Sequence, residues 1–195
     1  FLARRFMYWQ VYLHKTSMGA EILLAQILKR AKTLVEKQEK LPTNSDLLFF
    51  LQNRITLENF SNEVLDVFAQ LDEHTLMNAV NQWQHHPDFV LQNLCERLLN
   101  RKLFKVKLNN EPYSDDFYRK KIEMVQTLYE LSEEDAQYFV FGGVVSNKGY
   151  DNQLDKINIL TTKGKIKDIS KVSKLFTSTF LTEKLTKNYL CFPKS

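Results

Sequence analysis

The spacing of apolar residues changes near residue 102, and this change constrains the fold more than any other feature of the sequence. Before it, apolar residues recur at the spacing that places them on one side of an α-helix. After it, residues 103–108 begin to alternate apolar and charged side chains, as a β-strand with one buried face does. The chain is therefore predicted to be an α+β protein in two parts, residues 1–102 and residues 103–195.

The first part is predicted to be helical throughout. The chain of 195 residues holds 5 glycines and 4 prolines, the residues that most often end a helix. Asn44 is suited to cap the second helix, and Pro87 to open the last one with Asp88 in its first turn. The predicted helices span 1–38, 45–52, 57–71, 74–84 and 87–101.

The second part is predicted to alternate strands and helices. Ser114 can cap a helix, and residues 138–145 are rich in β-branched and aromatic side chains, with Gly142 predicting a bulge. The predicted elements are a strand at 103–108, a helix at 114–129, strands at 138–145 and 155–161, a short helix from 168 and a strand at 185–192. This β-α-β-β-α-β order is that of the ferredoxin-like fold.

Composition predicts a globular, cytoplasmic protein. Hydrophobic residues make up 44% of the chain, yet no apolar run is long enough to cross a membrane and no signal peptide is evident. Cys95 and Cys191 lack metal-ligand spacing, so both are expected to be reduced thiols. Phe1 is not an initiator methionine and the helical pattern starts without a capping residue, so we expect the chain to be a fragment of a longer protein.

The first fifteen residues form an unusual helical pattern. On a helix of about 100° per residue, two sides are apolar and the third carries four polar side chains within about 80° of one another. We call these four residues, Arg4, Tyr8, Tyr12 and Lys15, the opening ridge. Guanidinium and ammonium groups bind phosphate oxygens, and phenol rings pack on a base or sugar, so the ridge suits a nucleotide polyphosphate. Pairing with carboxylates from a preceding part of the protein is the alternative.

The segment 4–15 resembles the helix that follows the metal site in HD-domain phosphohydrolases. This family includes bacterial dNTP triphosphohydrolases and the vertebrate SAM-and-HD-domain dNTPase. The shared pattern is an arginine, an aromatic residue or histidine four positions on, and then Tyr-x-His-Lys; here it is formed by Arg4, Tyr8, Tyr12, His14 and Lys15. Residues 98–106, 155–159 and 189–192 resemble later segments of the same family in the same order.

The resemblance implies a fold and a reaction for the intact protein. Residues 1–102 would complete an all-α HD domain. The intact protein would be a metal-dependent, dGTP-type hydrolase that cleaves a deoxynucleoside triphosphate to deoxynucleoside and triphosphate. Arg4 would contact the triphosphate, Tyr12 the sugar, and Tyr8 would lie at a neighbouring substrate-facing position, although family members can have histidine there.

The resemblance also implies a regulatory phosphate-binding site between subunits, and hence a homo-oligomer. His14 and Lys15 match residues of the vertebrate relative that bind phosphates of an activating nucleotide. Arg101 and Lys105 match basic residues that reach the same site from another chain.

The metal centre is not expected in this chain. The family holds a divalent metal ion with two histidines and two aspartates, the central pair adjacent as His-Asp, and no His-Asp pair occurs here. The histidines are His14, His74, His85 and His86, and we assign none of them as a metal ligand. We therefore predict no catalytic residue in this fragment, which alone should be inactive without the missing N-terminal HD segment.

A second hypothesis comes from the charge of the last 48 residues. Residues 148–195 contain ten lysines against four acidic residues, a net charge of about +6. Such a segment can bind nucleic acid through its phosphates or take part in oligomer assembly. It can also protect the edge of a sheet from aggregation. An RNA-recognition module is not favoured, because its basic-Gly-aromatic signature is absent.

Overall fold

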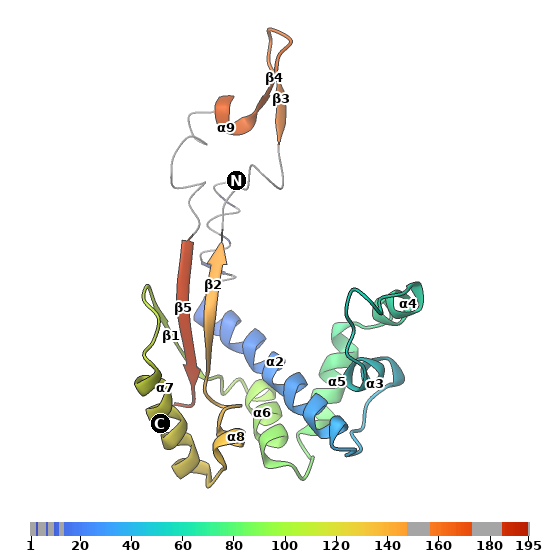
Figure 1. The fold of residues 1–195 in the computed structure, drawn as a ribbon, viewed down its shortest axis with the longest axis vertical. Helices are drawn as coiled ribbons and strands as arrows, with labels where there is room; N and C mark the ends of the chain where they lie inside the picture. The colour runs from blue at the N-terminus through green and yellow to red at the C-terminus, as the bar shows by residue number, and fades with distance from the viewer. Residues whose placement is uncertain are drawn as a thin grey trace.

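The computed structural model describes residues 14–147, 157–172 and 185–194, together with Ala3, Met7, Gln10 and Val11. Helices dominate up to residue 102, and strands and helices share the rest, so the fold is α+β as predicted (Figure 1). The helices are α2 (Lys15–Glu36), α3 (Ser45–Gln52), α4 (Asn62–Ala69), α5 (Glu73–Trp83), α6 (Phe89–Leu99), α7 (Asp115–Tyr129), α8 (Glu133–Ala136) and α9 (Ile169–Val172). The strands are β1 (Lys105–Asn109), β2 (Phe141–Asn147), β3 (Asn158–Leu160), β4 (Ile166–Asp168) and β5 (Leu185–Phe192).

Side-chain caps fix where the helices begin. Asn44 Oδ1 accepts a hydrogen bond from the Leu47 backbone N–H at 2.9 Å, so Asn44 caps α3 as predicted. Asp88 Oδ1 accepts from Leu91 N–H at 2.8 Å. Asp88 is thus the cap that precedes α6 and not a residue of its first turn, because its carboxylate satisfies an N–H that no helical carbonyl can reach.

The predicted helix at 1–38 is not continuous. His14 has an extended backbone (φ −66°, ψ 133°), and α2 begins after it at Lys15. His14 Nδ1 accepts a hydrogen bond from Thr16 N–H at 3.3 Å and so caps the new helix. The prediction of one unbroken helix is therefore wrong, and the angular spacing that grouped Lys15 with the rest of the opening ridge does not hold across His14.

The larger sheet has three antiparallel strands in the order β1-β5-β2. The last strand of the chain is therefore the central one. A ferredoxin-like sheet would also include the strand predicted at 155–161, but β3 pairs with β4 in a separate two-stranded sheet. Among the described residues the ferredoxin-like arrangement is thus not formed.

A tight turn explains this difference. The Thr161 N–H donates to the Lys165 carbonyl at 2.9 Å, and Gly164 takes a positive φ of 71° that favours glycine. The turn brings β4 onto β3, so the alternating residues around Ile159 pair locally. Figure 1 shows this hairpin and α9 beyond the end of β2 and the start of β5.

The three-stranded sheet lies between helices. On one face Val106 packs against α2, where a Cβ added to Gly19 would lie 3.3 Å from Val106 Cγ2. On the other face α7 packs on the sheet, and the Tyr118 hydroxyl donates to the Val140 carbonyl at 3.1 Å. One hydrophobic core includes residues from both sides of position 102, such as Leu23 and Leu190. The domain boundary at 102 stays a prediction. In the described residues we find no helix with the length and apolar character of a membrane span.

The predicted glycine bulge at Gly142 is absent. Strand β2 pairs with β5 in unbroken register, with Gly142 opposite Leu190 and Gly143 opposite Tyr189. A Cβ at Gly142 would lie 2.8 Å from the Tyr189 carbonyl oxygen and 3.2 Å from the Tyr118 ring. Glycine is required here because the β5 backbone and α7 approach the strand closely, which a sequence pattern does not distinguish from a bulge.

Candidate functional site

Three residues of the opening ridge, Arg4, Tyr8 and Tyr12, lie outside the described residues. Their assignment to the substrate triphosphate, the sugar and the neighbouring substrate-facing position therefore stays a prediction. The residues predicted to bind a regulatory phosphate, in contrast, are all described.

His14 and Lys15 are both exposed, at the N-terminal end of α2. Because His14 Nδ1 accepts the hydrogen bond from Thr16, the Nε2 side of the ring is the side left for a ligand. Free backbone N–H groups and the positive end of the helix dipole favour an anion at such a position. The first turn of this 22-residue helix contains no acidic residue that would oppose an anion.

Arg101 lies close to the same end of α2. It follows α6 with a left-handed backbone (φ 54°) and lines a pocket of about 560 Å³ together with residues from the first two turns of α2. Thr16, Ser17 and Glu21 are among these residues, and Leu24, Met77, Leu98 and Leu103 provide much of the apolar wall. The fold therefore brings Arg101 next to the start of α2 within one chain.

Lys105 does not line this pocket. It is exposed on β1, and its neighbour Val106 is the residue that faces α2. Because side chains alternate along a strand, Lys105 lies on the opposite face of the sheet, where it lines a second pocket with Lys107 and Lys121. Arg101 and Lys105 thus line two different pockets, and neither pocket is lined by His14 or Lys15.

The described residues do not supply a metal site. No group of three or more histidine, cysteine, aspartate or glutamate side chains gathers within them in a way that could hold a metal ion. His86, half-buried, accepts a hydrogen bond at Nδ1 from the Asp88 N–H at 3.1 Å, and His85 is exposed. His74 lines a polar pocket of about 430 Å³ with Asp72 at the start of α5.

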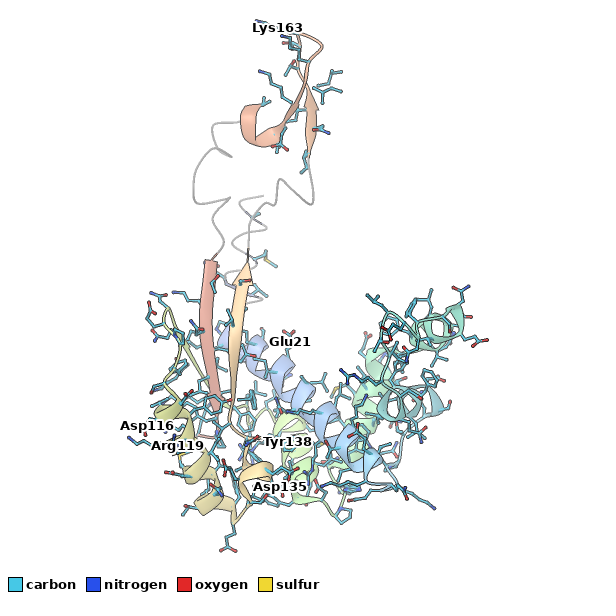
Figure 2. All side chains as sticks on the ribbon, viewed as in Figure 1. Glu21, Asp116, Arg119, Asp135, Tyr138 and Lys163 are labelled. Atoms are coloured by element: carbon cyan, nitrogen blue, oxygen red, sulfur yellow. The ribbon has the colours of Figure 1, made fainter. Side chains whose placement is uncertain are left out.

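Among the described residues, the most strongly buried charged side chain is one that the sequence pattern does not reveal. Arg30 in the middle of α2 is 5% exposed. Its Nη2 contacts Asp88 Oδ2 at 2.5 Å and its Nη1 contacts Asp135 Oδ1 at 2.8 Å. The guanidinium also lies 5.2 Å from the centre of the Tyr138 ring. Figure 2 shows Asp135 and Tyr138 at the lower end of the molecule, where α2, α6 and α8 meet.

The network also involves the acidic run Glu133-Glu134-Asp135. This run forms α8, which is capped by Ser132, and Asp135 pairs with Arg30. Burial by itself lowers the pKa of Arg30, but the hydrogen bond and charge of Asp88 outweigh burial and hold that pKa above its ordinary value. The cation is therefore permanent, and we interpret the network as structural.

Asp88 is expected to make the free energy of unfolding depend on pH under acidic conditions. Burial raises its pKa, but hydrogen bonds from Arg30 and the Leu91 N–H outweigh burial, so the pKa lies below the ordinary 3.8. A carboxyl group whose pKa is lower in the folded state than in the unfolded state stabilises the fold at pH values above its unfolded-state pKa. This stabilisation is lost as pH falls through its folded-state pKa. We expect the stability advantage of wild type over Asp88→Asn to shrink below about pH 4, as measured by urea unfolding at several pH values. An advantage that grows with acidity would contradict this.

Both cysteines are buried and unpaired, as predicted. Burial raises the pKa of the Cys95 thiol to about 12 and that of Cys191 to about 12. A thiol with so high a pKa is not a nucleophile at neutral pH. The burial of both sulfurs therefore does not favour cysteine catalysis at either position.

Comparison with known proteins gives relatives and a solved structure, while no protein-family model matches the chain. The uncharacterized protein YwfO of Bacillus subtilis is 29% identical over 99% of this chain and 43% of its own length. The uncharacterized protein MG461 of Mycoplasma genitalium is 24% identical over 89% of this chain and 41% of its own length. The chain spans less than half the length of these relatives.

The solved structure is a phosphohydrolase from Bacteroides thetaiotaomicron. It is 36% identical to this chain, superposes with a TM-score of 0.86, and matches 99% of this chain and 48% of its own. A likeness of this extent shows that the two proteins share the fold described above.

Proposed function

We propose that this chain is the C-terminal part of an HD-type phosphohydrolase that hydrolyses deoxynucleoside triphosphates of the dGTP type. The likeness to the solved phosphohydrolase carries the proposal, because it extends over 99% of this chain at 36% identity. That likeness supports phosphohydrolase chemistry in general. The more specific substrate rests on the family pattern Arg4, Tyr8, Tyr12, His14 and Lys15 in the first fifteen residues.

In the proposed reaction, water attacks the α-phosphorus of the nucleotide. The bond from that phosphorus to the sugar oxygen breaks, and the products are the deoxynucleoside and inorganic triphosphate. A divalent metal ion supplies activation of water and neutralises phosphate charge in enzymes of this type. The family resemblance would place the ligands of that metal in the missing N-terminal HD segment, and the residues described here include no group that could hold it.

The residues of this chain would bind and orient the nucleotide. Arg4 would hold the triphosphate through charge-assisted hydrogen bonds, and Tyr12 and Tyr8 would position the sugar and its surroundings. His14 and Lys15 would bind phosphates of a regulatory nucleotide at the exposed N-terminal end of α2. Arg101 and Lys105 would reach that nucleotide from a neighbouring subunit, and within one chain they line two different pockets.

The test uses the intact protein, including the sequence before Phe1. Purified protein is incubated with each of the four deoxynucleoside triphosphates and a series of divalent metals, and the products are separated by chromatography. We expect deoxynucleoside and triphosphate, with no diphosphate intermediate, and loss of both products when the metal is chelated. Release of only monophosphate, or no turnover of any nucleotide, would overturn the assignment.

A binding role without catalysis is the second candidate. The observation that favours it is the β3–β4 hairpin, on which Lys163, Lys165 and Lys167 are all exposed. Figure 2 shows Lys163 at the tip of this hairpin. Lysines on a projecting hairpin can contact a nucleic acid backbone or another subunit, and nucleic acid binding would weaken steeply with salt.

A further inference from the structure

Four lysines from three separate parts of the chain line one pocket on the α7 side of the three-stranded sheet. The pocket has a volume of about 430 Å³. We call it the lysine pocket; its walls are formed by Lys105, Lys107, Lys121, Lys194, Phe192 and Pro193.

The strand register explains why these side chains converge. Lys105 and Lys107 are two positions apart on β1 and so point to the same face of the sheet. Lys105 lies directly opposite Phe192 of β5, which places Lys194 near the same edge of the sheet. Lys121 comes from α7, which covers this face, and its Nζ lies 4.7 Å from the centre of the Phe192 ring.

Aromatic rings hold two of the ammonium groups in place. Besides its contact with Phe192, Lys121 Nζ lies 5.7 Å from the centre of the Phe117 ring, and Lys107 Nζ lies 5.3 Å from the same centre. Both lysines are half-buried. A ring face orients a cation but does not cancel its charge. The charges of these two lysines are thus held in place and are not neutralised by the rings.

No carboxylate of the described part of the chain forms an ion pair with any of the four lysines. The next residue on α7 is different, because Lys120 Nζ pairs with Asp116 Oδ2 at 2.8 Å on the exposed side of the helix. Four like charges around one concavity repel one another and raise the local potential. An arrangement of this kind is stabilised when an anion occupies the pocket.

We propose that the lysine pocket is a second anion site that binds a small molecule with a polyphosphate group. Its volume is in the range of small-molecule sites, which run from about 300 to 1,000 Å³. Ammonium groups act as compact point charges for phosphate oxygens, and four of them match the several negative charges of a triphosphate. A concave pocket favours such a compact ligand over an extended nucleic acid strand, which would need a continuous groove.

The proposal goes beyond the proposed function. Only Lys105 is shared with the regulatory site that the family resemblance implies. Lys107, Lys121 and Lys194 have no part in that site, and the pocket that holds Arg101 lies against α2 on the other face of the sheet. The two sites can therefore be separated by mutation.

The test is a calorimetric titration of this 195-residue chain with sodium tripolyphosphate at low salt. The double variant Lys107→Met/Lys121→Met removes two charges while the side chains still pack on the phenylalanines. We expect wild type to bind, and the double variant to bind at least about tenfold more weakly, because hydrogen bonds to charged groups contribute strongly. Lys194→Glu, at an exposed position beyond β5, should weaken binding similarly and serves if the double variant does not fold.

The matched control is Lys40→Met/Lys120→Met, which removes two exposed lysines outside the pocket. It should change the affinity less than about twofold, since exposed charges are screened by salt. Arg101→Ala removes a cation of the regulatory site, so tripolyphosphate binding that persists in this variant and weakens in Lys107→Met/Lys121→Met belongs to the lysine pocket. No binding by wild type, or equal losses in both double variants, would overturn the proposal. Tighter binding of single-stranded oligonucleotides that increases with their length and depends on Lys107 and Lys121 would show a nucleic acid surface instead.

Discussion

Replacing Arg30 with alanine is expected to lower the free energy of unfolding by about 3–5 kcal/mol, which is the cost of breaking a buried ion pair by removing one partner. The change removes the partner that keeps the Asp88 carboxylate charged. The Asp88 side chain is only 16% exposed, so water cannot fully replace that partner. It also frees Asp135 from α2 and so loosens the junction of α2, α6 and α8. Urea unfolding followed by far-ultraviolet circular dichroism measures the change.

Two control variants separate the ion pair from a general loss of positive charge. Arg119→Ala removes an exposed arginine of α7, labelled in Figure 2, and should change the unfolding free energy by less than about 0.5 kcal/mol. Arg30→Lys keeps the charge but cannot donate from a planar fork to both aspartates, so an intermediate loss is expected. If Arg30→Ala unfolds with the same midpoint as Arg119→Ala, the network does not stabilise the fold.

Under the proposed function, Arg4→Ala in the intact protein is expected to reduce kcat/KM for the preferred deoxynucleoside triphosphate roughly a hundredfold or more. The reason is that a preorganised donor to developing phosphate charge contributes on this scale to transition-state stabilisation. Steady-state kinetics with triphosphate release as the readout measures the loss. Arg4→Lys should restore part of the activity, since it keeps the charge without the bidentate geometry.

Arg5 provides the matched control for this experiment. It is the neighbouring arginine, and the helix predicted from the sequence would direct its side chain about 100° away from that of Arg4. The family resemblance gives Arg5 no substrate contact, so Arg5→Ala should keep most of the activity. Equal losses in the two variants would mean that positive charge alone matters here, and unchanged turnover in Arg4→Ala would remove the role we give it.

Much of the fold could be predicted because local patterns decide helices. The cap at Asn44 and the change of period near residue 102 both follow from short-range chemistry, and both are confirmed. The sheet could not be predicted in the same way, because strand order depends on pairing between residues far apart in the chain. Ile159 pairs with Lys167 in a local hairpin. The alternating pattern around Ile159 does not decide whether its partner strand is near or distant in the sequence.

The candidate site, too, could be predicted from the sequence only in part. Basic residues such as Lys15 and Arg101 could be singled out from a resemblance in sequence. The break at His14 could not, since a histidine inside a helical pattern gives no sign that its ring will cap the next helix. The Arg30 network could not be predicted either, because its partners Asp88 and Asp135 lie 58 and 105 positions away from Arg30 in the sequence. Both depend on tertiary packing, which a spacing pattern does not contain.

The central position of β5 has a consequence for biosynthesis. A ribosome makes β1 and β2 first, and these two strands have no hydrogen bonds to each other in the finished sheet. The backbone N–H and C=O groups that these strands direct toward β5 have no partner strand until residues 185–192 have been translated and can insert between them. Folding of this half is thus delayed relative to the helices, and a premature stop codon before Leu185 would remove the middle of the sheet and not its margin.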